Sequence, residues 1–118
     1  MAKESLAQKA ILDWLAWKKI FHYRNNSGAF VSEYNGKRSF TKFGALGSPD
    51  IICVVNGRYI GLEVKAPKGK QNENQKKFQK ELEKAGGIYI LIHDVDELAK
   101  MLKFDKNAGY DLINNPEW

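Results

Sequence analysis

The spacing of apolar and polar residues predicts a chain of alternating helices and strands. Apolar residues recur at helical spacing in three segments, whereas short, nearly continuous apolar runs are typical of buried strands. The predicted helices cover 3–20, 72–85 and the stretch from Asp94 through Leu102, and the predicted strands cover 21–25, 51–55, 58–65 and 88–92. This order, without an internal repeat, predicts an α/β fold with a mixed β-sheet flanked by helices.

Two Asn-Gly dipeptides predict tight hairpins. Asn56-Gly57 joins the strands at 51–55 and 58–65, and Asn35-Gly36 lies within a second, short hairpin at 30–43. Both residues of such a dipeptide tolerate the positive φ that a two-residue hairpin turn requires. We therefore expect antiparallel pairing on each side of both turns.

The Asn56-Gly57 hairpin carries charged residues inside otherwise apolar strands. Strand side chains alternate between faces, so Glu63 and Lys65 share a face with Gly61, and the intervening apolar residues pack on the other face. Counting back across the turn places Asp50 opposite the Glu63 end of the hairpin. Two carboxylates and an amine are therefore expected to converge there.

The predicted helix at 72–85 has recognisable ends. Asn72 and Gln75 have the spacing of a capping box, and Gly86-Gly87 suit the left-handed residue that commonly ends a helix. Gln75 falls on the packing face of this helix together with Phe78, so its amide needs a polar partner in the fold.

Length and composition predict one domain, residues 1–118, with a core at about 3–103 and a C-terminal tail at 104–118. No apolar run approaches the ~20 residues of a membrane span, and the N-terminus lacks the apolar region of a signal peptide. The single cysteine, Cys53, lies in an apolar strand, which excludes an internal disulfide and a cysteine-based metal cluster. We expect a cytoplasmic protein without membrane contact.

The positive charge of the chain is concentrated in one segment. The formal net charge is +5, and residues 65–84 contain seven lysines against three acidic residues. Such a segment is typical either of a solvated helix face or of a surface that binds nucleic acid phosphates. The residues that we expect to contact nucleic acid are Lys68, Lys70, Lys76, Lys37, Arg38 and Arg24.

The charged end of the hairpin has the chemistry of a magnesium site. Mg²⁺ prefers oxygen ligands, usually one or two carboxylates completed by water and substrate phosphate. Asp50 and Glu63 supply carboxylates, and the Val64 carbonyl supplies a further oxygen. Lys65 would stabilise a metal-bound hydroxide or the charge that develops on phosphorus. The simpler alternative is a salt bridge between these groups at a sheet edge.

The ordered motif resembles the VRR-NUC domain, a branch of the PD-(D/E)XK nuclease superfamily, in its small stand-alone form from phages and bacteria. In that pattern an acidic residue of the first helix precedes a glycine-rich loop ending in Asp, then Glu-X-Lys, then a helical Gln. The matching positions here are Glu4, Gly47-Ser48-Pro49-Asp50, Glu63-Val64-Lys65 and Gln75, and the similarity runs from about residue 4 to 103.

The resemblance implies a restriction-endonuclease-like core and a role for each matching residue. It implies metal ligation by Asp50, Glu63 and the Val64 carbonyl, with Glu4 holding a metal-bound water or a second ion. Lys65 would assist the nucleophile, and Gln75 would orient Lys65 or contact phosphate. For Glu4, the helix dipole offers a simpler explanation, because a carboxylate in the first turn stabilises a helix.

The expected function is that of a metal-dependent, structure-specific endodeoxyribonuclease that uses Mg²⁺, with Mn²⁺ as a possible substitute. The resemblance suggests branched DNA such as a four-way (Holliday) junction, and a homodimer, because two symmetric nicks need two active sites. Two alternatives remain open: a restriction-like, sequence-specific nuclease, and a non-catalytic nucleic-acid-binding module. In a bacterial cell or an infected host, either nuclease would act in the cytoplasm.

Overall fold

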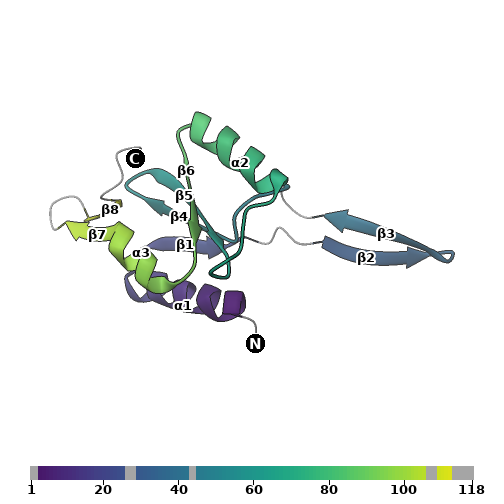
Figure 1. Ribbon diagram of the computed structural model, residues 1–118, viewed down its shortest axis with the longest axis horizontal. Coiled ribbons are helices and arrows are strands. Elements are labelled where there is room, and N and C mark those ends of the chain that lie inside the picture. The colour runs from purple at the N-terminus through teal and green to yellow at the C-terminus, as the bar shows by residue number, and fades with distance from the viewer. Residues whose placement is uncertain (1–2, 26–28, 43–44, 106–108, 113–118) are drawn as a thin grey trace.

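The centre of the molecule is a mixed four-stranded β-sheet (Figure 1). The computed structural model describes residues 3–25, 29–42, 45–105 and 109–112. The sheet has the strand order β1-β4-β5-β6 and consists of β1 (Phe21–Arg24), β4 (Ile51–Val55), β5 (Arg58–Val64) and β6 (Ile88–Ile92). β1, β4 and β5 pair antiparallel, and β6 runs parallel to β5. The predicted α/β fold with a mixed sheet is confirmed.

Helices cover both faces of this sheet (Figure 1). On one face, α1 (Lys3–Trp17) and α3 (Val95–Met101) contribute Ile11, Leu15 and Leu98 to a core shared with the inward residues of the strands. On the other face, α2 (Glu73–Lys84) lies over β5 and β6, where Phe78 packs against Tyr89. The sheet is therefore the middle layer of a three-layer arrangement.

The alternation predicted for β5 is confirmed, with one difference. Ile60, Leu62 and Val64 lie in the core shared with α1 and α3, and Glu63 faces the opposite side of the sheet. We expected that side to expose its carboxylate, but Glu63 is only 4% exposed. The reason is that α2 covers this end of the face, since Gln75 of α2 hydrogen-bonds the Glu63 side chain.

Both Asn-Gly turns form as predicted. Asn56 and Gly57 have φ of 51° and 79°, and Asn35 and Gly36 have φ of 50° and 74°. The second turn joins β2 (Ala29–Tyr34) to β3 (Lys37–Lys42), and these strands form a separate two-stranded sheet. This hairpin extends away from the main sheet, and the whole molecule measures 60 × 33 × 27 Å (Figure 1).

The helix boundaries agree with the sequence at α2 and differ at the other two helices. α2 begins after Asn72 with a complete capping box. The first helix ends at Trp17, short of the predicted residue 20, because Lys19 takes a left-handed φ of 58° and the chain turns to bury Ile20. Leu102 leaves the third helix and starts a strand.

The predicted tail contains a further hairpin that the sequence analysis missed. β7 (Leu102–Asp105) pairs antiparallel with β8 (Gly109–Leu112), whereas residues 113–118 of the predicted tail lie outside the described residues. In the part of the chain that the structure describes, no helix is long and apolar enough to cross a membrane.

Candidate functional site

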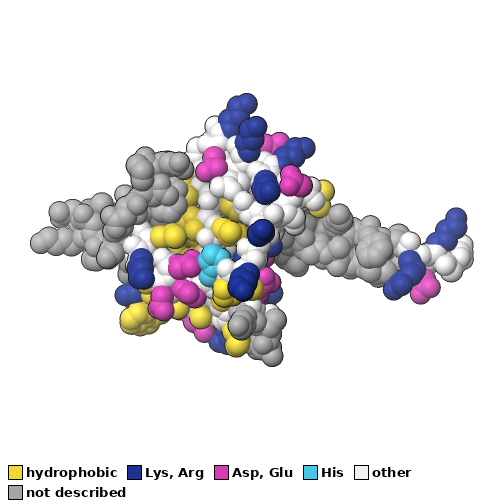
Figure 2. All heavy atoms as spheres, in the orientation of Figure 1, with side chains coloured by type: hydrophobic (Ala, Val, Ile, Leu, Met, Phe, Trp, Pro, Cys, Tyr) yellow, Lys and Arg dark blue, Asp and Glu magenta, His cyan; other side chains and the backbone are white. Residues whose placement is uncertain are grey.

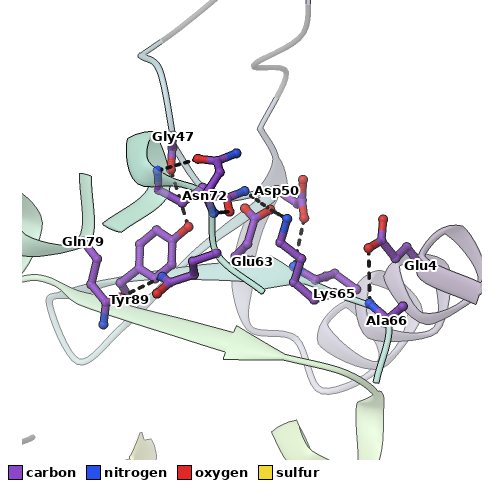
Figure 3. Close-up of polar contacts among 12 residues, drawn as sticks. Glu4, Gly47, Asp50, Glu63, Lys65, Ala66, Asn72, Gln79 and Tyr89 are labelled. Carbon is purple, nitrogen blue, oxygen red and sulfur yellow. Dashed lines mark hydrogen bonds and ion pairs between the residues drawn. The ribbon is translucent and has the colours of Figure 1, made fainter. Parts of the chain in front are cut away.

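Asp50 and Glu63 lie side by side because of the register of two neighbouring strands. Ile51 pairs with Leu62, so the residue before Ile51 falls opposite the residue after Leu62. Asp50 Oδ2 accepts a hydrogen bond of 2.8 Å from the backbone N–H of Val64 (Figure 3). The backbone therefore fixes the Asp50 carboxylate against the end of β5, as the sequence predicted.

Glu63 is a buried carboxylate with one partnered oxygen and one unpartnered oxygen. Its Oε1 accepts a hydrogen bond of 2.8 Å from Gln75 Nε2 and lies 3.8 Å from Lys65 Nζ (Figure 3). Its Oε2 is buried and makes no hydrogen bond. A buried polar atom without a partner is costly, so this oxygen favours a proton or a cation beside it.

The electrostatics of Asp50 and Glu63 also favour a proton or a cation between the two carboxyl groups. Burial, together with the neighbouring Asp50 charge, raises the pKa of Glu63 to about 8. Burial also raises the pKa of Asp50, although the Val64 hydrogen bond and the Lys65 charge oppose that shift. A buried carboxylate beside a half-buried one resists simultaneous ionisation of both, so near neutral pH the pair retains a proton unless a cation replaces it.

Gln75 is held by the first turn of its own helix. Its side-chain Oε1 accepts from the backbone N–H of Asn72 at 2.9 Å, and its backbone N–H donates to Asn72 Oδ1 at 2.9 Å. The remaining amide group points into the fold and donates to Glu63. The polar partner that Gln75 was expected to need is therefore Glu63, and a role toward Lys65 or phosphate stays a prediction.

The structure places Glu4 beside the same strand end. Its Oε1 accepts a hydrogen bond of 3.2 Å from the backbone N–H of Ala66, 62 residues away, and its charge contributes to the raised pKa of Asp50 (Figure 3). Among the described residues, no three His, Cys, Asp or Glu side chains are grouped so that they could hold one metal ion. Glu4 thus lies near the Asp50–Glu63 pair without completing a three-carboxylate set.

Glycines allow the loop before Asp50 to pack closely. Gly47 has a φ of 81°, and a Cβ there would overlap the backbone of Asn74 in the first turn of α2. A Cβ on Gly61 of β5 would overlap the ring of Pro49. The loop is thereby pressed between the sheet and α2, which sets the position from which Asp50 projects.

Asn25 and Tyr89 brace this loop, and the sequence pattern offers little sign of the contact that Tyr89 makes. Asn25 Nδ2 donates to Ser48 Oγ at 2.9 Å and to the Pro49 carbonyl at 2.8 Å, so this residue connects the end of β1 to the loop. The Tyr89 hydroxyl donates to the Gly47 carbonyl at 3.4 Å. Tyr89 lies in an apolar run that is typical of core packing, so only the fold reveals this contact.

The basic residues expected to contact nucleic acid lie in three places. Lys68 and Lys70 are exposed in the loop before α2, and Lys76 is exposed on α2, where Figure 2 shows several basic side chains together. Lys37 and Arg38 are exposed at the turn of the β2–β3 hairpin. Arg24 is exposed on the α1 side of the sheet, where it lines a hollow with residues of α1, away from the face of Glu63.

Neither a protein-family model nor a curated protein matches this chain.

Proposed function

We propose that this protein is a metal-dependent endodeoxyribonuclease of the VRR-NUC type, with a restriction-endonuclease-like core, that cleaves branched DNA. The observation that carries the proposal is the buried, unpartnered Oε2 of Glu63 beside Asp50. Lys65 forms an ion pair with the other oxygen of this carboxylate, and that pair leaves Oε2 without a partner. Here Lys65 Nζ is 3.8 Å from the other oxygen, too far for a hydrogen bond.

The two carboxylates fit a divalent cation of the Mg²⁺ or Mn²⁺ class. Asp50 and Glu63 would hold it, and oxygen from the Val64 carbonyl and water near Glu4 would complete its shell. Such a cation polarises a phosphate and lowers the pKa of a bound water. A cation would also offset the burial and the neighbouring carboxylate charges, of Glu4 on Asp50 and of Asp50 on Glu63, that raise the two carboxyl pKa values.

Other residues of the site would position the carboxylates and the phosphate. Gln75 fixes the orientation of Glu63 through its hydrogen bond to Oε1. Lys65 has its ammonium group 3.8 Å from Glu63 Oε1 and would stabilise negative charge on the phosphate or on the attacking water. Lys68 and Lys70 follow on the loop next to the site, where they would hold the neighbouring backbone phosphates.

A homodimer with branched DNA as its substrate is the assembly that we propose. The described part of the chain carries one such site, and symmetric nicks across a four-way junction need two sites related by a two-fold axis. The net charge of +5 favours a polyanionic substrate.

Cleavage of matched labelled DNAs tests the proposal. Linear duplex, single strand, flap and four-way junction are incubated with Mg²⁺, Mn²⁺ or EDTA. We expect metal-dependent nicking of the branched substrates by the wild type and at least a 100-fold loss with Asp50→Asn, which keeps an acceptor for the Val64 N–H. The control Asp96→Asn, at an exposed residue of α3, should cleave normally. Tight binding of every substrate without any metal-dependent cutting would contradict the proposal.

Metal binding gives a second test that does not depend on activity. Because a cation would neutralise the two carboxylates in the folded state only, Mg²⁺ or Mn²⁺ should raise the Tm of the wild type. The increase should be lost in Asp50→Asn and retained in Asp96→Asn. Equal increases in all three proteins would show that the cation binds elsewhere.

A further inference from the structure

On the side of the sheet that carries Glu63, no helix of the part of the chain that the structure describes lies over β1 and β4 (Figure 1). Residues Phe21, Tyr23, Val54 and Tyr59, here called the aromatic face, lie on the β1, β4 and β5 part of this side, whereas α2 lies over β5 and β6. Phe21 is 67% exposed and Tyr23 is 49% exposed. Their rings contact edge to face, with centroids 6.4 Å apart.

The aromatic face belongs to the same side of the sheet as the carboxylate site. Tyr23 pairs with Ile52 of β4, and Asp50 lies two residues before Ile52, immediately ahead of that strand. Side chains two apart on a strand share a face at a spacing of about 7 Å. Phe21, two residues further from the site, continues the same row along β1.

The surroundings of the aromatic face suit a nucleotide better than a second protein surface. Lys19, Phe21 and Val54 line a hollow of about 150 Å³, so a basic residue and an exposed aromatic residue border the same hollow. Bases stack on aromatic rings while lysines contact their phosphates, and open sheet faces with exposed aromatics bind unpaired nucleotides in this way. The positive net charge of the chain favours the same partner.

We propose that the aromatic face binds unpaired nucleotides that adjoin the scissile phosphate, with Phe21 and Tyr23 as stacking platforms and Lys19 on the backbone. This inference rests on the proposed nuclease function and narrows its substrate class. Successive nucleotides of an extended strand would run along β1 away from Asp50. The preferred DNA would then have single-stranded character beside the cut, as a flap or a splayed junction arm does.

Binding of a short oligothymidylate in EDTA tests the aromatic face apart from cleavage. Phe21→Ala should weaken the affinity at least about fivefold, the low end for loss of one stacked base. Phe21→Leu should weaken it similarly, because leucine is apolar but has no ring, and Phe21→Tyr should stay near wild type. Trp17→Ala removes an exposed aromatic from α1, on the other side of the sheet, and should change nothing.

The outcomes separate this inference from the nuclease proposal. Suppose that Phe21→Ala reduces metal-dependent cleavage of a flap more than it reduces cleavage of a linear duplex. That result would support both the nucleotide-binding face and the nuclease proposal. Normal cleavage of the flap and unchanged oligothymidylate binding by Phe21→Ala would overturn the inference and leave the nuclease standing. Oligothymidylate binding that depends on Phe21 without any cleavage would overturn the nuclease proposal alone.

Loss of a dimer by light scattering in Phe21→Ala, with unchanged oligonucleotide affinity, would assign the face to a second copy of the chain and overturn the inference.

Discussion

At the scale of single residues, the protein keeps one acid in an unfavourable environment. Glu63 is buried beside Asp50 and has one hydrogen-bonded oxygen, and its pKa is raised to about 8 from an ordinary 4.5. A carboxyl group in this position destabilises the fold whenever it must ionise. Carboxyl groups with strongly raised pKa values are common at functional sites.

The raised pKa of Glu63 predicts how stability changes with pH. Between pH 4.5 and about 8, the unfolded chain has released a proton that the folded chain retains, so this group lowers the free energy of unfolding as pH rises. Above about pH 8, Glu63 is ionised in both states and lowers the free energy of unfolding no further. Glu63→Gln removes the titration and can keep the Gln75 hydrogen bond, so its stability relative to wild type should be greater at pH 8 than at pH 5.

Urea unfolding in metal-free buffer across this pH range measures the difference in the free energy of unfolding between Glu63→Gln and the wild type. The control Glu81→Gln changes an exposed residue of α2 and should follow the wild-type pH dependence. Parallel curves for wild type and Glu63→Gln would contradict the raised pKa.

At the scale of elements, the site depends on how a loop fits between β5 and the start of α2. Gly61 leaves room for the Pro49 ring, and Gly47 lets the loop pass the backbone of Asn74. The capping box of Asn72 and Gln75 then fixes the first turn of α2 against the loop and Glu63. Asp50 and Glu63 meet because these three elements pack closely.

Gly61→Ala tests this fit. In a strand, alanine in place of glycine would ordinarily stabilise by about 0.5–1 kcal/mol, but here the added methyl overlaps the Pro49 ring. We expect the free energy of unfolding to fall by about 1–3 kcal/mol, measured by urea denaturation. Combined with Pro49→Ala, which removes the overlapping ring, the loss should be smaller than the sum of the single effects. Strict additivity would show that the two residues do not compete for space.

At the scale of the whole molecule, the β2–β3 hairpin is a separate extension of a compact body. Its two strands pair with each other and not with the main sheet, and it accounts for the elongated outline (Figure 1). Lys37 and Arg38 at its turn are exposed, as are the lysines near the site. Branched DNA held at the site would extend far enough to meet both basic regions.

Neutralising the hairpin turn should change how DNA affinity responds to salt. If Lys37 and Arg38 each contact a phosphate, Lys37→Gln with Arg38→Gln should make the slope of log affinity against log salt shallower by about 2 for duplex arms. Lys100→Gln, at an exposed site on α3, should leave the slope unchanged. Anisotropy titrations of a four-way junction measure the slopes, and an unchanged slope in the double variant would remove the hairpin from the DNA interface.

The sequence alone determined the features that are encoded within a few residues of each other. Turn geometry at both Asn-Gly dipeptides, the capping box of α2 and the alternation along β5 all follow from local backbone preference and side-chain period. The hairpin register then placed Asp50 opposite Glu63, so the pair itself was predictable. The β7–β8 hairpin was missed because its sequence has no comparably strong turn or periodic signal.

Only the tertiary structure decided the environment of the pair. The cover of α2 over Glu63, the hydrogen bond from Gln75 and the approach of Glu4 to Ala66 join segments that are distant in the chain. The same packing leaves Phe21 and Tyr23 open on the neighbouring half of the face. Burial and charge act through space, so the pKa of a carboxylate and the exposure of a ring are set when the layers pack, whereas turns and caps are set by neighbouring residues.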